Sequence, residues 1–542
     1  MKARVWPTAD VRMPGLFAAA VLVFTTLPVS SQLALAQFTQ QGPKLVGTGA
    51  VGNAAQGQSV ALSANGNTAI VGGALDNAAA GAVFGTGAAW VYTRSGGVWT
   101  QQGGKLVGTG AAGIVARQGS SVALSADGNT AIVGGIGDDA ETGAAWVFTR
   151  SGGVWTQQGD KLVGTGTVVP AEQGISVALS ADGNTAVVGA PADNAATGAA
   201  WVFTRSGGVW TQQGGKLVGT GGVGIGGQGR SVALSADGNT AIVGGSFDNA
   251  LVGAAWVYTR SGGVWTQQGS KLVGTGAVGR SGQGLSVALS ADGNTAMVGG
   301  LTDNANVGAA WVYTRSAGVW TQQGDKLVGT GAVGTANQGS SVALTGDGNT
   351  ALVGGRGDNA AAGAVWVFKR SAGVWTQFGS KLVGTGAIGN AFQGFSAALS
   401  ADAGTAIVGG QQDNAAQGAA WVFVQPILRV SPPSGTTISD TVGRPAPRPF
   451  FRYRLRSTFD SVGFAISGIP PWLNADFTSG KATTLPLTVT FSLINVANLK
   501  PGTYTAIIAF TNTSNGLGDT TRKVTLIVRP PRKNGHADDD ED

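Results

Sequence analysis

The sequence predicts an all-β fold, a seven-bladed β-propeller followed by an immunoglobulin-like β-sandwich. Three observations predict it: a repeated unit of about 55 residues, four short apolar segments in each unit, and a change of composition after residue 425. A fixed period of this size indicates units that bury a core only by packing against their neighbours. The marker Lys-Leu-Val-Gly-Thr-Gly begins at Lys44, Lys105, Lys161, Lys216, Lys271, Lys326 and Lys381.

Residues 1–36 are typical of a secretory signal. Basic residues precede an apolar stretch at 16–29, and Ala34-Leu-Ala fits a cleavage site before Gln37. The alternative is an uncleaved anchor, but the stretch is shorter than the roughly 20 apolar residues of a membrane span. We expect a bacterial protein that is secreted or held in the periplasm or cell envelope. After cleavage it has no transmembrane segment, and we expect a monomer.

The composition excludes some classes of partner. The chain has no cysteine, and a propeller of this length has ample core without disulfides. Its net charge is +6, but the repeats are nearly balanced and the basic excess lies in residues 427–533. Such a balance gives no broad electrostatic footprint for nucleic acid. We therefore expect no nucleic-acid partner.

The unit that starts at Lys216 illustrates the four strands. Residues 231–235 and 240–244 are short and apolar, and Asp-Gly between them is a strong hairpin signal. Residues 254–260 alternate large and small side chains, so Trp and Tyr share one face and Ala, Val and Thr the other. After a Ser-Gly-Gly turn, residues 264–268 form the outer strand. Four antiparallel strands per unit describe propeller blades.

Tryptophans recur at two places in the unit. We expect both sets to pack between blades, and the alternative is a surface on which sugars stack. The third-strand set is Trp90, Trp146, Trp201, Trp256, Trp311, Trp366 and Trp421. The fourth-strand set is Trp99, Trp155, Trp210, Trp265, Trp320 and Trp375.

The two ends of the repeat array complement each other. The seventh unit stops at Val424 after its third strand, and residues 38–42 match the start of a fourth strand. The N-terminal segment is therefore expected to complete the last blade, which leaves no exposed sheet edge. This predicts a closed ring, not an open solenoid.

The blade motif resembles the FG-GAP repeats of integrin α-chain propellers and their bacterial relatives. Residues 228–235 match the start of that repeat, and Gly189-Ala-Pro keeps its end; the resemblance covers residues 38–425. It implies calcium in the loop between the first two strands. Here residues 235–239 offer one carboxylate, and Asn65 replaces it in the first unit, whereas calcium takes six to eight oxygens. The ligand pattern is incomplete, so we expect no cofactor and a plain hairpin turn.

Acidic residues recur in the loops between the second and third strands. These loops share a propeller face with the connections between blades, which is where ligands bind in propellers of this resemblance. The prediction is a ring of carboxylates that contacts a sugar, a cation or a protein, without a defined metal site. The alternative is that each side chain fixes its own turn. The residues are Asp76, Asp138, Asp193, Asp248, Asp303, Asp358 and Asp413.

The sequence offers few residues for catalysis. The one histidine, His536, lies in the tail, and the glutamates are Glu141, Glu172 and Glu541. An enzyme needs an acid, a base or a nucleophile in one special place, and the repeats are too alike to supply one. We therefore expect no enzymatic activity.

Residues 427–530 read as six short strands, and residues 531–542 as a disordered acidic tail. Leu428–Gly435 and Pro471-Trp-Leu resemble the motifs of BACON-type domains, a resemblance that implies an immunoglobulin-like fold and a binding role. Arg452, Arg454 and Arg456 alternate with apolar residues, so a strand places them on one face. They are candidate contacts for acidic polysaccharide or lipopolysaccharide phosphate. The alternative is a solvated face that protects a sheet edge.

Together these observations predict an exported, non-enzymatic binding or adhesion protein. One propeller face would recognise an extracellular protein or carbohydrate. The copies differ most in the loops at 225–227, 280–282 and 391–392, where specificity would reside. The alternative is a structural envelope or matrix protein.

Overall fold

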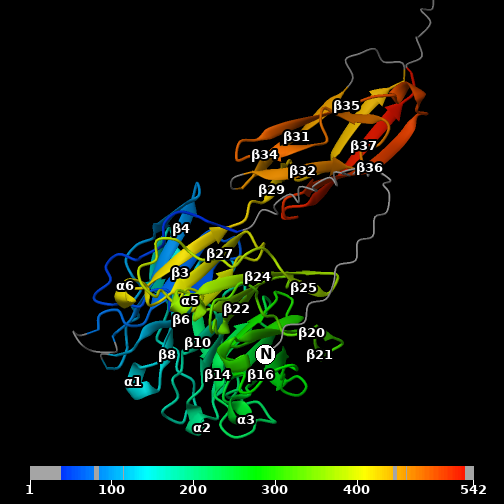
Figure 1. Ribbon diagram of the computed structural model, residues 1–542. Helices are drawn as coiled ribbons and strands as arrows, with labels where there is room; N and C mark the ends of the chain where they lie inside the picture. Colours follow the sequence, from blue (N-terminus) through cyan, green and yellow to red (C-terminus); the bar gives the residue numbers. More distant parts are fainter. Residues whose placement is uncertain (1–37, 79–84, 114, 443–448, 459–460, 532–542) are drawn as a thin grey trace, which may run out of the picture. The chain divides into compact units, whose positions relative to one another are not determined.

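The computed structural model describes residues 38–78, 85–113, 115–442, 449–458 and 461–531 (Figure 1). The fold is all-β, as predicted, with seven four-stranded sheets in succession and two further sheets after residue 427. The expected signal (1–36) and nearly all of the expected tail (531–542) lie outside the described residues. Among the described residues, no helix has both the length and the apolar character to cross a membrane.

Each of the seven sheets is a blade of four antiparallel strands, numbered here from the innermost strand outwards. The first strands are β2 (Ser59–Leu62), β6 (Gln118–Leu124), β10 (Ser176–Leu179), β14 (Gln228–Leu234), β18 (Ser286–Leu289), β22 (Gln338–Leu344) and β26 (Ser396–Leu399). The second are β3 (Thr68–Gly73), β7 (Thr130–Gly135), β11 (Thr185–Ala190), β15 (Thr240–Gly245), β19 (Thr295–Gly300), β23 (Thr350–Gly355) and β27 (Thr405–Gly410). The third are β4 (Ala88–Ser95), β8 (Ala144–Ser151), β12 (Ala199–Ser206), β16 (Ala254–Ser261), β20 (Ala309–Ser316), β24 (Ala364–Ser371) and β28 (Ala419–Val424). The fourth are β5 (Val98–Gln101), β9 (Val154–Gln157), β13 (Val209–Gln212), β17 (Val264–Gln267), β21 (Val319–Gln322), β25 (Val374–Gln377) and β1 (Thr39–Gln40).

A single short turn follows the second strand in blades 2 to 7. Its central residues have positive φ, for example Asn249 at 48° and Ala250 at 55°, so the turn is left-handed and not a regular helix. Asn tolerates this conformation better than most residues, which suits the repeated Asp-Asn pair. In Figure 1 three of these turns follow one another along one rim of the propeller. They are α1 (Asp138–Glu141), α2 (Asp193–Ala196), α3 (Asp248–Leu251), α4 (Asp303–Asn306), α5 (Asp358–Ala361) and α6 (Asp413–Ala416).

The ring closes as predicted. β1 pairs antiparallel with β28, so the N-terminal segment is the outer strand of blade 7. The main chain continues this pairing, with the amide of Gln41 donating to the carbonyl of Val422 at 2.8 Å. The apolar residues of blade 7 also pack against blade 1, where Ile407 and Val422 share a core cluster with Trp90. Both contacts join the ends of the array.

Packing between blades follows the two faces predicted for the third strand. Trp256 and Tyr258 of blade 4 pack against Ala200 and Val202 of blade 3. On the other side, Val257 packs against the Trp of blade 5. All seven third-strand tryptophans are fully buried, which confirms their core role. The fourth-strand set is half-buried, and its indoles pack against the outer part of the same clusters, as the prediction of packing between blades requires. Each of these indoles also lies under an arginine, as Trp265 does under Arg260 at 5.3 Å.

The seven hairpin turns between first and second strands form a ring of their own. In each turn one main-chain amide donates to the carbonyl of the corresponding residue in the next blade, at 2.9 Å in six cases and 3.2 Å in the seventh. The last link runs from Ala401 back to Ala64, so the ring is complete. The order of donors is Ala64, Ala126, Ala181, Ala236, Ala291, Gly346 and Ala401.

The C-terminal residues form a sandwich of two sheets. Side chains of both sheets meet in one buried cluster that includes Tyr453, Phe491, Phe510 and Trp472. One sheet has the order β29 (Leu428–Ser431), β31 (Phe450–Ser457), β35 (Leu487–Leu493) and β33 (Leu473–Ala475). The other has the order β30 (Thr436–Thr441), β37 (Thr520–Arg529), β36 (Gly502–Asn512), β32 (Val462–Ser467) and β34 (Ser479–Ala482), and a 3₁₀ turn spans Val496–Asn498.

Candidate binding site on the connector face

The connector face is the end of the propeller that carries the connections between blades and the turns after the second strands. The seven predicted aspartates lie at this face, but beneath its surface. Asp248, for example, has no solvent exposure. Its Oδ1 accepts a hydrogen bond from the amide of Val223 at 2.7 Å, and its Oδ2 lies 2.5 Å from Nζ of Lys271. Asp248 therefore ties the connection that enters its blade to the connection that leaves it.

The same arrangement recurs in every blade. Each lysine of the Lys-Leu-Val-Gly-Thr-Gly marker pairs with the aspartate of the preceding blade, and the pair between Lys44 and Asp413 joins blade 7 to blade 1. We call each such pair a staple. The other staples are Asp76–Lys105, Asp138–Lys161, Asp193–Lys216, Asp248–Lys271, Asp303–Lys326 and Asp358–Lys381.

The staples correct the prediction that these carboxylates contact a ligand. Both oxygens of each carboxylate already have protein partners, and the side chain is buried. Binding a ligand there would require an ion pair to break first. The alternative that each Asp fixes its own turn does not hold either, because Asp248 bonds the amide of Val223 and the ammonium of Lys271, which belong to the connections on either side of its blade.

A glutamine and a glycine complete each connection. Gln228 is buried, and its Oε1 accepts a hydrogen bond from the amide of Gly219 at 2.5 Å. The indole of Trp256 lies against the same glycine and donates to the carbonyl of Thr220 at 2.8 Å. A Cβ on Gly219 would sit 2.1 Å from the indole ring, so only glycine fits. The connections are therefore rigid scaffolding for the face.

The hairpin aspartates, which the resemblance associates with calcium, lie at the opposite end of each blade. Oδ1 of Asp237 accepts bonds from the hydroxyl of Ser235 and the amide of Asn239. Burial alone would raise the pKa of Asp237, but these bonds and the charge of Arg260 hold it below its ordinary value. No group of three or more His, Cys, Asp or Glu that could hold a metal ion is present among the described residues.

The connector face is uneven at blades 4 and 5. A hollow of about 480 Å³ lies between the turn after β15 and the connection that enters β18. Its wall is mainly apolar, and Arg280 lies in the same wall. Val278 is 53% exposed and Phe247 38% exposed, so the hollow opens to solvent. Its lining includes Phe247, Leu251, Val278, Leu285 and Leu301.

Ser246 adds one polar group to this hollow. Its side chain is 4% exposed, and its hydroxyl has no hydrogen-bond partner among the described residues. Buried hydroxyls normally have a partner, since leaving one unpaired costs about 1–3 kcal/mol. An apolar wall with one unpaired hydroxyl and one guanidinium is the usual composition of a ligand pocket.

Several of the lining residues stand at positions where the blades differ. The residue after Gln-Gly is Leu285 in blade 5 but Arg230 in blade 4, and the residue after the second strand is Leu301 in blade 5 but Arg356 in blade 6. The loop at 280–282 was singled out from the sequence, and Arg280 and Gly282 do line the hollow. The positions of Leu285, Leu301 and Ser246 were missed, although comparing the seven copies column by column would have found them.

The three candidate arginines of the sandwich are placed as predicted on one face. They alternate along β31 with the buried residues Phe451, Tyr453 and Leu455. However, β31 lies between β29 and β35 and is not at an edge. The protected edge in the alternative is therefore wrong, whereas its solvated face agrees with the exposure of all three arginines.

Comparisons with known proteins assign neither a family nor a role to this chain. No family model matches this chain, and no curated protein matches it. Among solved structures, the hydrazine synthase of Kuenenia stuttgartiensis matches with 13% identity and a TM-score of 0.42, over 67% of this chain and 94% of that one. The periplasmic gluconolactonase PpgL of Pseudomonas aeruginosa matches with 18% identity and a TM-score of 0.40, over 60% and 85%. The resemblances to FG-GAP and BACON-type proteins gain nothing from these matches.

These matches correct one prediction. The uniform repeats led us to expect a protein without enzymatic activity, but both matched structures are enzymes by name. At this identity and TM-score the likeness assigns no reaction to this chain.

Proposed function

We propose that this is an exported binding protein whose connector face recognises an extracellular protein or glycan through the hollow at blades 4 and 5. The observation that carries the proposal is the hollow itself. In a ring of near-identical blades, several of its lining residues, among them Leu251, Leu285 and Leu301, differ from the residues at the same positions of every other blade. Varied residues on a rigid scaffold are where recognition is usually built.

The chemistry of the wall defines what the hollow would accept. Leu251, Leu285 and Leu301 offer an apolar surface, Arg280 offers a positive charge, and the unpaired hydroxyl of Ser246 lies buried just behind the wall. An apolar group with a nearby hydrogen-bonding or acidic substituent satisfies all of them. Such a group would be an aromatic or aliphatic side chain of a partner protein, or an acylated sugar.

The test uses the full-length protein and the fluorescent probe 8-anilinonaphthalene-1-sulfonate, which is both apolar and anionic. We expect saturable binding that Leu285→Arg abolishes. That substitution fills the hollow with a side chain that blade 4 already carries as Arg230. Ile175→Arg, at the same position of blade 3, is the matched control and should leave binding unchanged. Equal binding by both variants would refute the assignment of this hollow.

The natural ligand would then be sought with an array of glycans and with candidate extracellular proteins. A ligand whose binding is lost in Leu285→Arg and kept in Ile175→Arg would support the proposed function. If the probe binds but no such ligand is found, the hollow is a pocket, but the result counts against recognition of an extracellular protein or a glycan.

A further inference from the structure

The outer face of the sheet β29–β31–β35–β33 has an unusual composition. On β31 the exposed residues are Phe450, Arg452, Arg454 and Arg456, while the residues between them are buried. The register places Arg454 opposite Ser431 of β29 and Thr488 of β35. Arg452 lies opposite Thr490. The face is thus a row of guanidinium groups flanked by hydroxyls.

Acidic residues are missing from the strands of this sheet. Within the described residues, β29, β31, β35 and β33 contain no Asp or Glu. In the described part of the chain, Arg454 and Arg456 form no ion pair or side-chain hydrogen bond, and Arg452 lies over the ring of Phe450 at 4.8 Å. Alternate residues on a strand are about 6.8 Å apart, so three like charges stand in a row. Among the described residues, the carboxylate on this face is that of Asp476, just beyond β33, which accepts the amide of Thr490 at 3.1 Å and forms no ion pair with the row.

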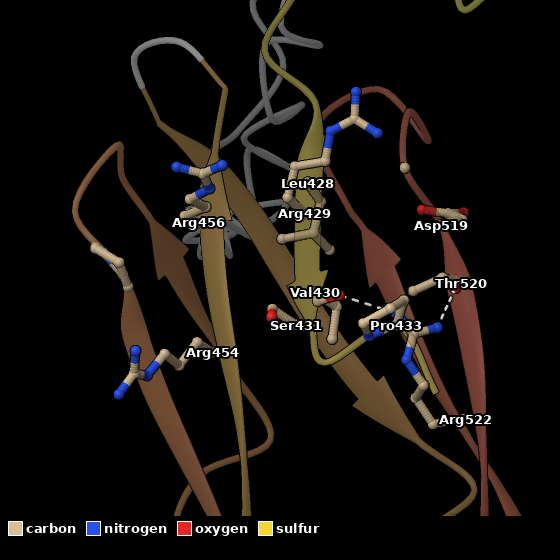
Figure 2. Close-up of a pocket in the computed structure, with 12 residues that line it drawn as sticks. Leu428, Arg429, Val430, Ser431, Pro433, Arg454, Arg456, Asp519, Thr520 and Arg522 are labelled. Carbon is tan, nitrogen blue, oxygen red and sulfur yellow. Dashed lines mark hydrogen bonds between the residues drawn. The ribbon is translucent and has the colours of Figure 1, made fainter. Parts of the chain in front are cut away.

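Two hollows follow this row. The first, of about 590 Å³, lies between β29 and β37, and Arg454 and Arg456 are among its lining residues (Figure 2). Across it, Arg522 is held by bonds to the carbonyl of Val430 at 2.9 Å and to the hydroxyl of Thr520 at 2.6 Å. The one carboxylate in its wall is that of Asp519, whose Oδ1 accepts the amide of Asn512.

The second hollow, of about 380 Å³, is lined by Ser431, Pro432, Arg452, Arg454 and Thr488. Because Arg454 lines both hollows, they form one track along β31. A track suits an extended chain better than a compact ligand. Its hydroxyls, at Ser431 and Thr488, repeat beside the positive charges.

We propose that this track binds an acidic polysaccharide, a chain of sugars that carries sulfate or carboxylate groups at intervals. Guanidinium forks pair with such planar or tetrahedral anions through charge-assisted bonds. The hydroxyls beside them match the sugar hydroxyls. Single-stranded nucleic acid is a poorer fit, because its binding relies on open aromatic platforms. On this face β31 offers one exposed aromatic, Phe450, and Arg452 already lies over its ring at 4.8 Å.

The experiment measures binding of full-length protein to heparin and to alginate, with dextran as the neutral polysaccharide. The test variant is Arg452→Gln/Arg454→Gln/Arg456→Gln. The matched control, Lys481→Gln/Lys500→Gln/Arg529→Gln, removes the same charge from exposed residues outside this sheet. We expect heparin or alginate to bind and dextran not to bind. The test variant should weaken binding about tenfold or more, and the control about twofold or less.

Further measurements distinguish a specific anion track from lost stability and from general charge attraction. Melting temperatures of both variants should equal that of the wild type, because all six side chains are exposed. Replacing the three arginines by lysine should restore only part of the affinity if the fork geometry matters. The proposal is overturned if neither acidic polysaccharide binds, or if both glutamine variants lose affinity equally. It is also overturned if single-stranded DNA or anionic lipid vesicles bind the same arginines more tightly at equal salt.

Discussion

The staple between Asp248 and Lys271 allows a quantitative test of what holds the connector face. The carboxylate is fully buried, whereas the side chain of Lys271 is 18% exposed. Lys271→Met leaves a buried charge with one remaining bond, from Val223, so we expect a loss of about 3 kcal/mol, at the lower end for a broken buried pair. Asp248→Asn should cost less, about 2 kcal/mol, because the flexible lysine can turn its ammonium towards water.

The double variant removes both charges and should cost about 2 kcal/mol, which gives an interaction energy of about 3 kcal/mol. Guanidinium chloride unfolding, followed by the fluorescence of the buried tryptophans, measures all four proteins, and refolding must retrace the same curve. The equivalent set in blade 6, at Asp358 and Lys381, should repeat the values because its geometry is the same. If Lys271→Met costs no more than Asp248→Asn, or the interaction energy is near zero, the reasoning fails.

Three other predictions concern the repeats. The buried hydroxyls of Tyr92, Tyr258 and Tyr313 have no partner among the described residues, and other blades carry Phe there, so each Tyr→Phe should stabilise the fold by about 1 kcal/mol, measured by denaturant unfolding. Burial raises the pKa of these phenols above the ordinary value of 10.0, so their contribution to wild-type stability is intact below pH 10 and falls as the pH rises above it. The triple Tyr→Phe variant should therefore lose less free energy of unfolding between about pH 9 and 11, which denaturant unfolding at the two pH values measures. The folded-state pKa is lowered for each of the hairpin carboxylates Asp127, Asp182, Asp237, Asp292 and Asp347, so they stabilise the fold above a pH of about 4 and lose this effect as the pH falls. Changing all five to Asn, the residue that blade 1 has at Asn65, should therefore flatten the fall of the free energy of unfolding at acid pH, and an unchanged fall would contradict this. Deleting residues 38–42 exposes the edge of β28, so we expect a lower melting temperature and, by light scattering, association that increases with protein concentration. A monomer of unchanged melting temperature would show that the closing strand is not needed for a stable propeller.

The fold could be predicted because its determinants are local and repeated. Each hairpin signal, each alternation of Trp with Ala or Val, and the missing fourth strand of the last unit are visible in the sequence, and β1 pairs with β28 as those signs required. Burial of Trp256 follows from the same alternation. The half-buried state of Trp265 does not, since it depends on Arg260 lying over the ring.

The site was less predictable because it depends on contacts between segments far apart in the chain. Asp248 and Lys271 are both conspicuous in the repeat, but nothing local to either shows that they pair. A repeated aspartate in a loop looks the same whether it faces solvent or a buried ammonium. The hollow at Leu285 and Leu301 depends on residues that blades 4 and 5 bring together, and no other blade has leucine at either position. The arginine row was predictable because strand alternation alone places it.

The closing strand also explains how the chain settles on one ring among many. Neighbouring units are so alike that the segment at 39–40 would find similar hydrogen-bonding edges on any third strand. Six of those edges are already occupied by the fourth strand of the same unit, and β28 alone has none. The N-terminal strand therefore pairs with the one edge that is free, and no specific recognition sequence is needed to set the number of blades. A gene that gained or lost one whole unit would still encode a chain with one free edge and one strand to fill it.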